Sequence, residues 1–246
     1  MNRNPCKVIK PISDEASYLA AITENPANEK KSAPGGRRKR SVGAWSKFWG
    51  NYRTLNITFL NEVPQCLQDS IESIIRQWQP STNLTFTFDA SLPGDIRIQT
   101  GTEHNSSAVG SDALGIPIDQ PTLTLATPSN GTDFEATVLH EFGHALGLEH
   151  EHQHPKANIP WDKPKVYEFY KTLDKWTEDD VDFNLFRTLP TNGLLSGAYD
   201  KESIMHYSIP NEITLGDWEV GYNTRISKLD RRNMRKAYPK AEQPID

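Results

Sequence analysis

TDFEATVLHEFGHALGLEHEHQH, residues 132–154, brings together residue types and spacings that are typical of a metal site. The pattern H-E-x-x-H-x-x-G-x-x-H falls on His140, Glu141, His144, Gly147 and His150. Residues four apart lie on one face of a helix, so His140 and His144 can point their imidazoles at one ion. Glu141 lies one position further round, where its carboxylate can reach a metal-bound water without being a ligand.

The second half of this pattern supplies a third ligand. A catalytic zinc takes three protein ligands and keeps one position open. Gly147 can enter the left-handed conformation that ends a helix, and the turn can then bring His150 to the same ion. The alternative is a buried helix with incidental histidines, but six of the seven histidines fall between residues 140 and 206. We therefore expect one zinc ion bound by His140, His144 and His150.

A second motif, SIMHY, lies downstream at residues 203–207. Together with the histidine pattern it resembles the metzincin clan of zinc endopeptidases. Glu151, directly after the third histidine, is similar to the astacin branch of that clan. The resemblance covers about residues 45–240 and implies that Met205 lies under the zinc as an apolar floor. It also implies that Tyr207 is a fifth, displaceable ligand that swings away to stabilise the oxyanion, since a phenol can both coordinate and donate a hydrogen bond.

Outside the motifs, the apolar patterning predicts an α+β fold, and the resemblance implies a metzincin, zincin-like catalytic domain. We expect a twisted mixed sheet with the active-site helix in an N-terminal subdomain. A mostly irregular or helical C-terminal subdomain, which contains the methionine turn, should follow. Strands are predicted at residues 55–60, 85–88, 95–99 and 123–125, and helices at 64–79, 161–170, 177–186 and 230–238. Residues 101–111 are rich in serine and glycine and are expected to form a loop.

Residues 1–44 are expected to form an N-terminal extension of a catalytic domain at residues 45–246. Within it, residues 26–36 have the composition of an exposed linker, and one short helix is expected at residues 13–22. The basic run Arg37–Arg40 permits two interpretations, a processing site or a solvated linker, and the linker is preferred because no signal peptide is visible. Cys6 could in principle plug the zinc site as a thiolate. It lacks the surrounding motif of matrixin-like relatives, so no latency device is expected.

Composition argues against several classes of partner. A net charge of −5 gives no reason to expect nucleic acid or an anionic membrane, and no apolar run is long enough to span a bilayer. The absence of a visible signal peptide favours a cytoplasmic or non-conventionally exported protein. The chain is expected to be a monomer, a prediction that no sequence pattern supports. Extracellular astacin-like domains usually carry two internal disulfides, which cannot form from the two cysteines Cys6 and Cys66. Glycosylation sequons are interpreted as chance at Asn56, Asn83, Asn105 and Asn130.

The expected function is the hydrolysis of peptide bonds through a zinc-activated water, with Glu141 as general base and Tyr207 as a stabiliser of the developing negative charge. In the resembled family an extended peptide adds to the edge strand before the zinc helix, which we place at Leu123–Leu125. His152 and His154 are interpreted as loop residues rather than ligands. Two alternatives stay open: a zinc-containing module that binds peptides without cutting them, and a metal-dependent hydrolase with other substrates.

Overall fold

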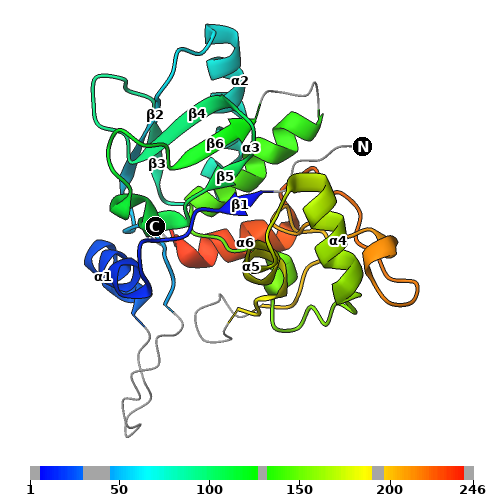
Figure 1. Ribbon diagram of the computed structural model, residues 1–246. Coiled ribbons are helices and arrows are strands. Elements are labelled where there is room, and N and C mark those ends of the chain that lie inside the picture. Colours follow the sequence, from blue (N-terminus) through cyan, green and yellow to red (C-terminus); the bar gives the residue numbers. More distant parts are fainter. Residues whose placement is uncertain (1–5, 30–44, 127–131, 190–196, 241–246) are drawn as a thin grey trace, which may run out of the picture.

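A computed structural model describes residues 6–29, 45–126, 132–189 and 197–240 of the chain (Figure 1). Its strands are β1 (Lys7–Val8), β2 (Thr54–Phe59), β3 (Thr85–Thr87), β4 (Ile96–Thr102), β5 (Ser106–Ser107) and β6 (Leu123–Ala126). The α-helices are α1 (Asp14–Glu24), α2 (Gln65–Ile75), α3 (Thr132–Ala145), α4 (Lys163–Asp174), α5 (Glu178–Val181) and α6 (Lys228–Ala237). Short 3-10 turns and the π-turn η5 (Asp182–Phe186) connect several of them.

The strands form one mixed sheet in the order β1-β5-β6-β4-β2-β3. Neighbours among β2, β3, β4 and β6 are parallel, β5 is antiparallel to β6, and β1 adds to β5 in parallel. The prediction that Leu123–Leu125 is an edge strand is therefore wrong, because β6 lies between β5 and β4. The strand that borders β6 on its outer side is β5 (Ser106–Ser107), which lies in the segment expected to be a loop. A polar strand of two residues has no alternating pattern by which it could be predicted.

Helices α2 and α3 bury their apolar faces against the sheet in one core, which confirms the apolar spacing predicted for both helices. Ile71 and Ile75 of α2 and Leu139 and Phe142 of α3 are completely buried. Each such side chain contributes about 1.5–3 kcal/mol through its removal from water. The indole of Trp78 also donates a hydrogen bond of 3.1 Å to the Leu139 carbonyl, so the two helices are locked together. The core therefore holds α3, and the histidines that it carries, in a fixed position.

The C-terminal half packs around a second apolar cluster, which includes Val166 of α4, Trp176, Val181 of α5 and Leu185 of η5. The helices expected at 161–170, 177–186 and 230–238 are confirmed in outline by α4, by α5 with η5, and by α6. After α6, the hydroxyl of Tyr238 donates to the Leu146 carbonyl at 2.7 Å, just beyond the end of α3. The residue that follows α6 is thereby fixed to the end of the active-site helix.

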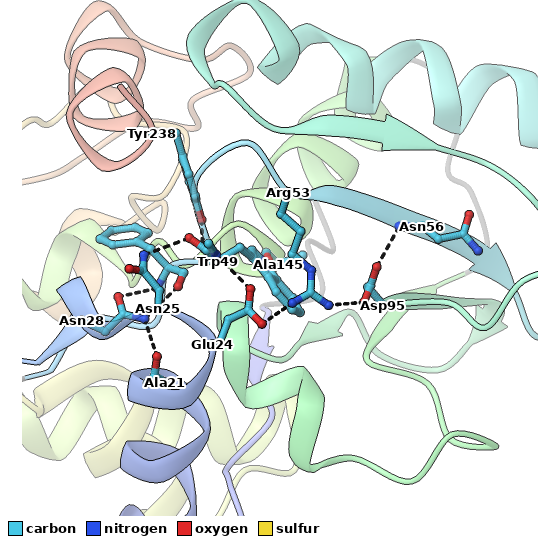
Figure 2. A network of polar contacts seen from close by, with 12 residues as sticks. Ala21, Glu24, Asn25, Asn28, Trp49, Arg53, Asn56, Asp95, Ala145 and Tyr238 are labelled. Carbon is cyan, nitrogen blue, oxygen red and sulfur yellow. Dashed lines mark hydrogen bonds and ion pairs between the residues drawn. The ribbon is translucent and has the colours of Figure 1, made fainter. Parts of the chain in front are cut away.

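The N-terminal segment is packed against the catalytic part by a polar network (Figure 2). Glu24, at the end of α1, pairs with Arg53, whose guanidinium also lies 2.7 Å from Asp95. The Asn25 amide donates to the Trp49 carbonyl at 3.0 Å, and the Asn28 side chain bonds to both backbone polar groups of Phe48. Residues 26–29, at the start of the predicted linker, are therefore folded, and α1 confirms the short helix predicted at residues 13–22. The run Arg37–Arg40 lies outside the described residues, and the domain boundary at residue 45 stays a prediction.

Three further sequence features have structural counterparts. In the described ranges no helix is long and apolar enough to cross a membrane. Cys6 is buried, Cys66 is exposed, and both are free thiols. The sequon residues Asn56 and Asn105 are each only 6% exposed, and both side chains are hydrogen-bonded to backbone, which leaves no room for a glycan in the folded chain.

Candidate metal centre and active site

The turn after α3 brings the third histidine to the site in the way that the glycine predicts. Gly147 has φ +98°, a conformation that favours glycine, and an added Cβ would lie 2.7 Å from the Phe48 ring. The Leu148 N–H donates to the Gly143 carbonyl at 3.0 Å, and the Gly147 N–H donates to the His144 carbonyl at 2.7 Å. These two bonds form a Schellman motif, which ends the helix and turns the chain back toward its own side chains.

The three predicted histidines meet in one cluster, in which His144 and His150 are buried and His140 is half-buried. The Nε2 atoms of His144 and His150 are 3.0 Å apart, and the ring of His140 lies 4.8 Å from that of His144, centroid to centroid. One ligand atom from each of these histidines and the sulfur of Cys6 all lie within 4.8 Å of one another. Four such donors around one point match the tetrahedral nitrogen and sulfur environment that zinc prefers.

Hydrogen bonds orient two of these imidazoles for metal binding. Nδ1 of His140 lies 2.7 Å from the Ile204 carbonyl, and Nδ1 of His144 lies 2.7 Å from the Leu148 carbonyl. Because a carbonyl can only accept, each Nδ1 carries the proton and each Nε2 presents a bare lone pair. Among the described residues, the buried Nε2 of His140 has no hydrogen-bond partner. A zinc ion satisfies such an atom, so the residues present fit the metal.

The pKa values of the histidines favour the neutral, ligating form. Burial lowers the pKa of His140 to about 3 and that of His144 to about 4, and it lowers the pKa of His150 well below its usual range. The neighbouring histidines lower the pKa of His140 and His150 further, because a second positive ring would be close by. The cluster therefore offers three uncharged imidazoles at neutral pH.

Cys6 occupies the fourth position of the cluster, a placement that the sequence analysis considered but did not favour. Its thiol is buried and donates a hydrogen bond of 3.0 Å to Oε2 of Glu141. Burial raises the pKa of this thiol well above its ordinary value, and the Glu141 charge raises it further. A divalent cation held by the histidines would supply the opposite charge that favours a thiolate. This placement differs from the expectation that Cys6 does not plug the site, because its sulfur lies at the position that a catalytic site keeps open.

Glu141 faces this fourth position without joining the four donor residues. Its side chain is 1% exposed, and burial raises the pKa of its carboxyl to about 8. Oε2 of Glu141 lies 3.0 Å from the Cys6 sulfur. At this distance the carboxylate can exchange a proton with an atom in the fourth position. The predicted general base thus lies where the reaction would need it.

The side chain of Tyr207 borders the cluster next to His150. Its ring centroid lies 4.4 Å from that of His150, and its hydroxyl donates a hydrogen bond to the carbonyl oxygen of Cys6. The Tyr207 hydroxyl can therefore donate to a peptide carbonyl beside the metal site. This is the geometry that stabilisation of an oxyanion requires.

Met205 lies beneath α3, at the level of the histidines. It is 2% exposed, and its sulfur touches the position where Gly143 lacks a Cβ. Asp230 of α6 holds the preceding turn by accepting hydrogen bonds from the Ser203 hydroxyl at 2.6 Å and from the Ile204 N–H at 2.9 Å. The methionine therefore forms a fixed apolar surface against the active-site helix.

Gly143→Ala is expected to destabilise the folded chain and to weaken metal retention. An added Cβ would clash with the sulfur of Met205 and would come within 3.3 Å of the Trp78 ring. Overpacking of this kind costs about 1–3 kcal/mol in the free energy of unfolding. Thermal unfolding and zinc content would be measured beside Gly221→Ala, where an added Cβ meets nothing within 4 Å. Equal melting temperatures for the two variants would contradict the close fit of Met205 under α3.

The segment Cys6–Ile9 lies in extended form between two walls, neither of which the sequence patterns identified. On one side, the N–H groups of Lys7 and Ile9 donate to carbonyls of Asn105 and Ser107, at 3.0 Å and 2.9 Å. On the other side, the Val8 N–H donates to the Asn184 side chain at 3.3 Å. Figure 1 shows β1 running between the sheet and the part of the chain that contains α4 and α5. The N–H groups of Lys7, Val8 and Ile9 are thus bound alternately by the strand region 105–107 and by Asn184.

His152 supports one of these walls. It is buried, and its Nε2 lies 2.7 Å from the carbonyl oxygen of Asn184. Neither His152 nor His154 is among the four residues of the metal cluster in the described ranges, which agrees with their interpretation as non-ligands. His152 is nevertheless a buried residue of a 3-10 turn rather than a free loop residue.

Comparison with known sequences shows which proteins the chain is similar to. The family model that describes the astacin peptidases matches residues 42–239. The zinc metalloproteinase dpy-31 of Caenorhabditis elegans is 26% identical over 257 residues, which cover 96% of this chain and 38% of that protein. Stromelysin-1 of Mus musculus is 28% identical over 163 residues, which cover 56% of this chain and 31% of that protein. The chain therefore spans less than half the length of these relatives.

Solved structures extend the comparison to the fold. A structure of myroilysin superposes with a TM-score of 0.76 at 36% identity, over 80% of this chain and 97% of that one. High choriolytic enzyme 1, a hatching enzyme zinc-protease of Oryzias latipes, is only 16% identical and shares the fold with a TM-score of 0.52, over 84% of this chain and 97% of that one. The comparisons confirm the predicted α+β metzincin fold and the predicted class, a zinc metalloprotease. Because the family match covers most of its length, the chain belongs to the astacin family of peptidases.

Proposed function

We propose that this chain is a zinc-dependent endopeptidase that is held latent by its own N-terminal segment. His140, His144 and His150 would hold the zinc, and the sulfur of Cys6 would fill the remaining position. The observation that carries the proposal is the four-residue cluster, in which one donor atom of each residue lies within 4.8 Å of the others. A catalytic zinc site needs an open position, so the enzyme is active only when Cys6 has left.

The residues of the chain then have distinct roles in hydrolysis. Zinc supplies Lewis-acid activation of a water and of the peptide carbonyl, which makes a nucleophile available at neutral pH. Glu141 takes the proton from the attacking water and passes it to the amine nitrogen as the C–N bond breaks. Tyr207, whose hydroxyl donates to the Cys6 carbonyl in the latent state, donates to the oxygen of the scissile carbonyl as its negative charge develops. Water thus adds across the peptide bond without any other reactant.

Substrates of this family are peptides or proteins, and the N-terminal segment indicates how an extended chain is held. We propose that a substrate replaces residues 6–9, with its backbone bound by the outer strand β5 and by the side chain of Asn184. Main-chain hydrogen bonds of this kind hold the scissile carbonyl at the metal and ask little of the substrate sequence.

The two alternative functions make different predictions about Glu141. A module that only binds peptides has no use for a buried carboxylate 3.0 Å from the fourth metal position. A hydrolase for other substrates would use Glu141 but has no use for the backbone contacts of β5 and Asn184 with an extended segment. Both observations favour the endopeptidase.

The test of the proposed function combines metal analysis with the cleavage of casein. The full chain would be assayed before and after limited digestion with trypsin, which would be blocked by a serine-protease inhibitor before casein is added. We expect about one zinc per chain, little cleavage before digestion, strong cleavage after it, and loss of cleavage on addition of a chelator. Bound zinc without cleavage in any sample would favour the binding module. Cleavage that resists the chelator would contradict the zinc mechanism.

A further inference from the structure

The side chains of the N-terminal segment identify a cation-binding wall beside the active site. We define the α5 wall as Trp176, Asp180 and Phe183, which lie immediately before, within and after α5. Lys7, the residue next to Cys6, places its Nζ 3.5 Å from Oδ2 of Asp180 and 5.1 Å from the centre of the Trp176 ring. A carboxylate and an aromatic face thus bind the same ammonium group.

The wall is held in place by its own packing. Trp176 is 3% exposed and stacks on Tyr170 of α4, with ring centroids 4.9 Å apart and planes 28° from parallel. Oδ2 of Asp180 also accepts hydrogen bonds from the hydroxyl and the N–H of Thr177, at 2.8 Å and 3.1 Å, which fixes its rotamer. The cation site therefore exists before an occupant arrives, and little entropy is lost when one binds.

A second lysine of the same segment contacts the same wall. Nζ of Lys10 lies 4.6 Å from the centre of the Phe183 ring. Residues 177–182 have the sequence TEDDVD, with four carboxylates, while Lys175 adjoins Trp176 and the guanidinium carbon of Arg187 lies 4.5 Å from the centre of the Phe183 ring. Both the aromatic faces and the local charge favour positively charged side chains.

An extended substrate would present a side chain to this wall. Side chains of an extended chain alternate in direction, so a peptide that replaces residues 6–9 places one side chain where Lys7 now lies, next to the residue at the metal. We propose that the α5 wall is a subsite that selects substrates with lysine or arginine close to the bond that is cut. The proposal rests on the proposed endopeptidase function. Lys7 is then the occupant of this subsite in the latent chain.

The test compares matched peptides with trypsin-activated enzyme. Internally quenched peptides would differ only at single positions around the cut, with lysine or the uncharged norleucine. We expect one position at which lysine raises kcat/KM on the order of tenfold, from the ion pair and the cation–π contact together. Asp180→Asn should reduce this ratio to below about threefold, because the amide keeps the cap of α5 but removes the charge. Asp69→Asn, the same change at an exposed position of α2, should leave the ratio unchanged.

Each outcome decides the proposal. Equal kcat/KM for lysine and norleucine at every position would overturn it while leaving the endopeptidase intact, and so would a lysine preference that Asp180→Asn does not reduce. If no peptide is cut at all, the endopeptidase function fails, and the binding of the same peptides would be measured by fluorescence anisotropy. Tighter binding of a lysine peptide that Asp180→Asn weakens would still support the subsite. Equal binding of all peptides would overturn it.

Discussion

The full-length chain with Cys6→Ala is expected to cleave casein without any processing, at a rate at least about tenfold above that of the unprocessed wild-type chain. The change removes the sulfur from the fourth position of the histidine cluster and the hydrogen bond from that sulfur to Glu141. One interaction of this strength, about 1.5–3 kcal/mol when a charged group takes part, corresponds to a factor of about ten to a hundred in the fraction of open sites. With zinc bound, the thiol would have given up its proton, so the metal–sulfur bond would replace this hydrogen bond rather than add to it.

The matched control for this experiment is Cys66→Ala. Cys66 is the other cysteine of the chain, and it is exposed on α2, remote in sequence from the histidine cluster. Its replacement should leave the chain latent. Cobalt substitution gives a second measurement, because a thiolate bound to cobalt produces a charge-transfer band that Cys6→Ala should lose. If Cys6→Ala stays as inactive as the wild type but becomes active after digestion, the backbone of the segment, rather than the sulfur, would be the cause of latency.

Backbone contacts explain why the Cys6 variant need not reach full activity. Three hydrogen bonds, from the N–H groups of Lys7, Val8 and Ile9, hold the segment in place independently of the sulfur. Farther along, Glu24, Asn25 and Asn28 anchor the end of α1 to the catalytic part (Figure 2). Digestion should therefore raise the activity of the Cys6→Ala chain further, because release of the segment also frees β5 and Asn184.

The parts of the site that the sequence predicts are those encoded locally. His140, His144 and Gly147 lie within about two helical turns of one another, so helical geometry and the preference of glycine for positive φ fix their arrangement. The α+β fold was predictable for a similar reason, because the long helices and central strands carry clear apolar periodicity. In such segments the pattern of burial and the local sequence agree.

The parts that escaped prediction depend on contacts between distant segments. Cys6 and Glu141 are 135 residues apart, and Val8 and Asn184 are 176 apart. Strands β1 and β5 have two residues each, too few for any periodic signal. A lone cysteine near the N-terminus was the available hint of a fourth donor, but its position in the fold depends on how β1 and α1 pack. Neither propensity nor a motif encodes that packing.

Glu141→Gln is expected to remove turnover from the activated enzyme while leaving the zinc in place. Glu141 is outside the set of donor atoms, so glutamine in its place does not alter the ligand set. Glutamine keeps the size of the side chain but cannot accept the proton of the attacking water. General-base catalysis contributes about 10²–10⁴-fold, so kcat should fall by this factor. His144→Ala, in contrast, should lose both zinc and activity, because it removes a donor.

The matched control is Glu135→Gln, which makes the same change on the same helix. Glu135 accepts a hydrogen bond of 2.7 Å from the Gln77 amide, away from the metal cluster, and glutamine can still accept it. This variant should retain wild-type kcat and zinc content. Near-normal turnover by Glu141→Gln would mean that another group is the base. Loss of zinc from Glu141→Gln would mean that the carboxylate acts by holding the site together. Only loss of turnover with zinc retained separates the catalytic role of Glu141 from a structural one.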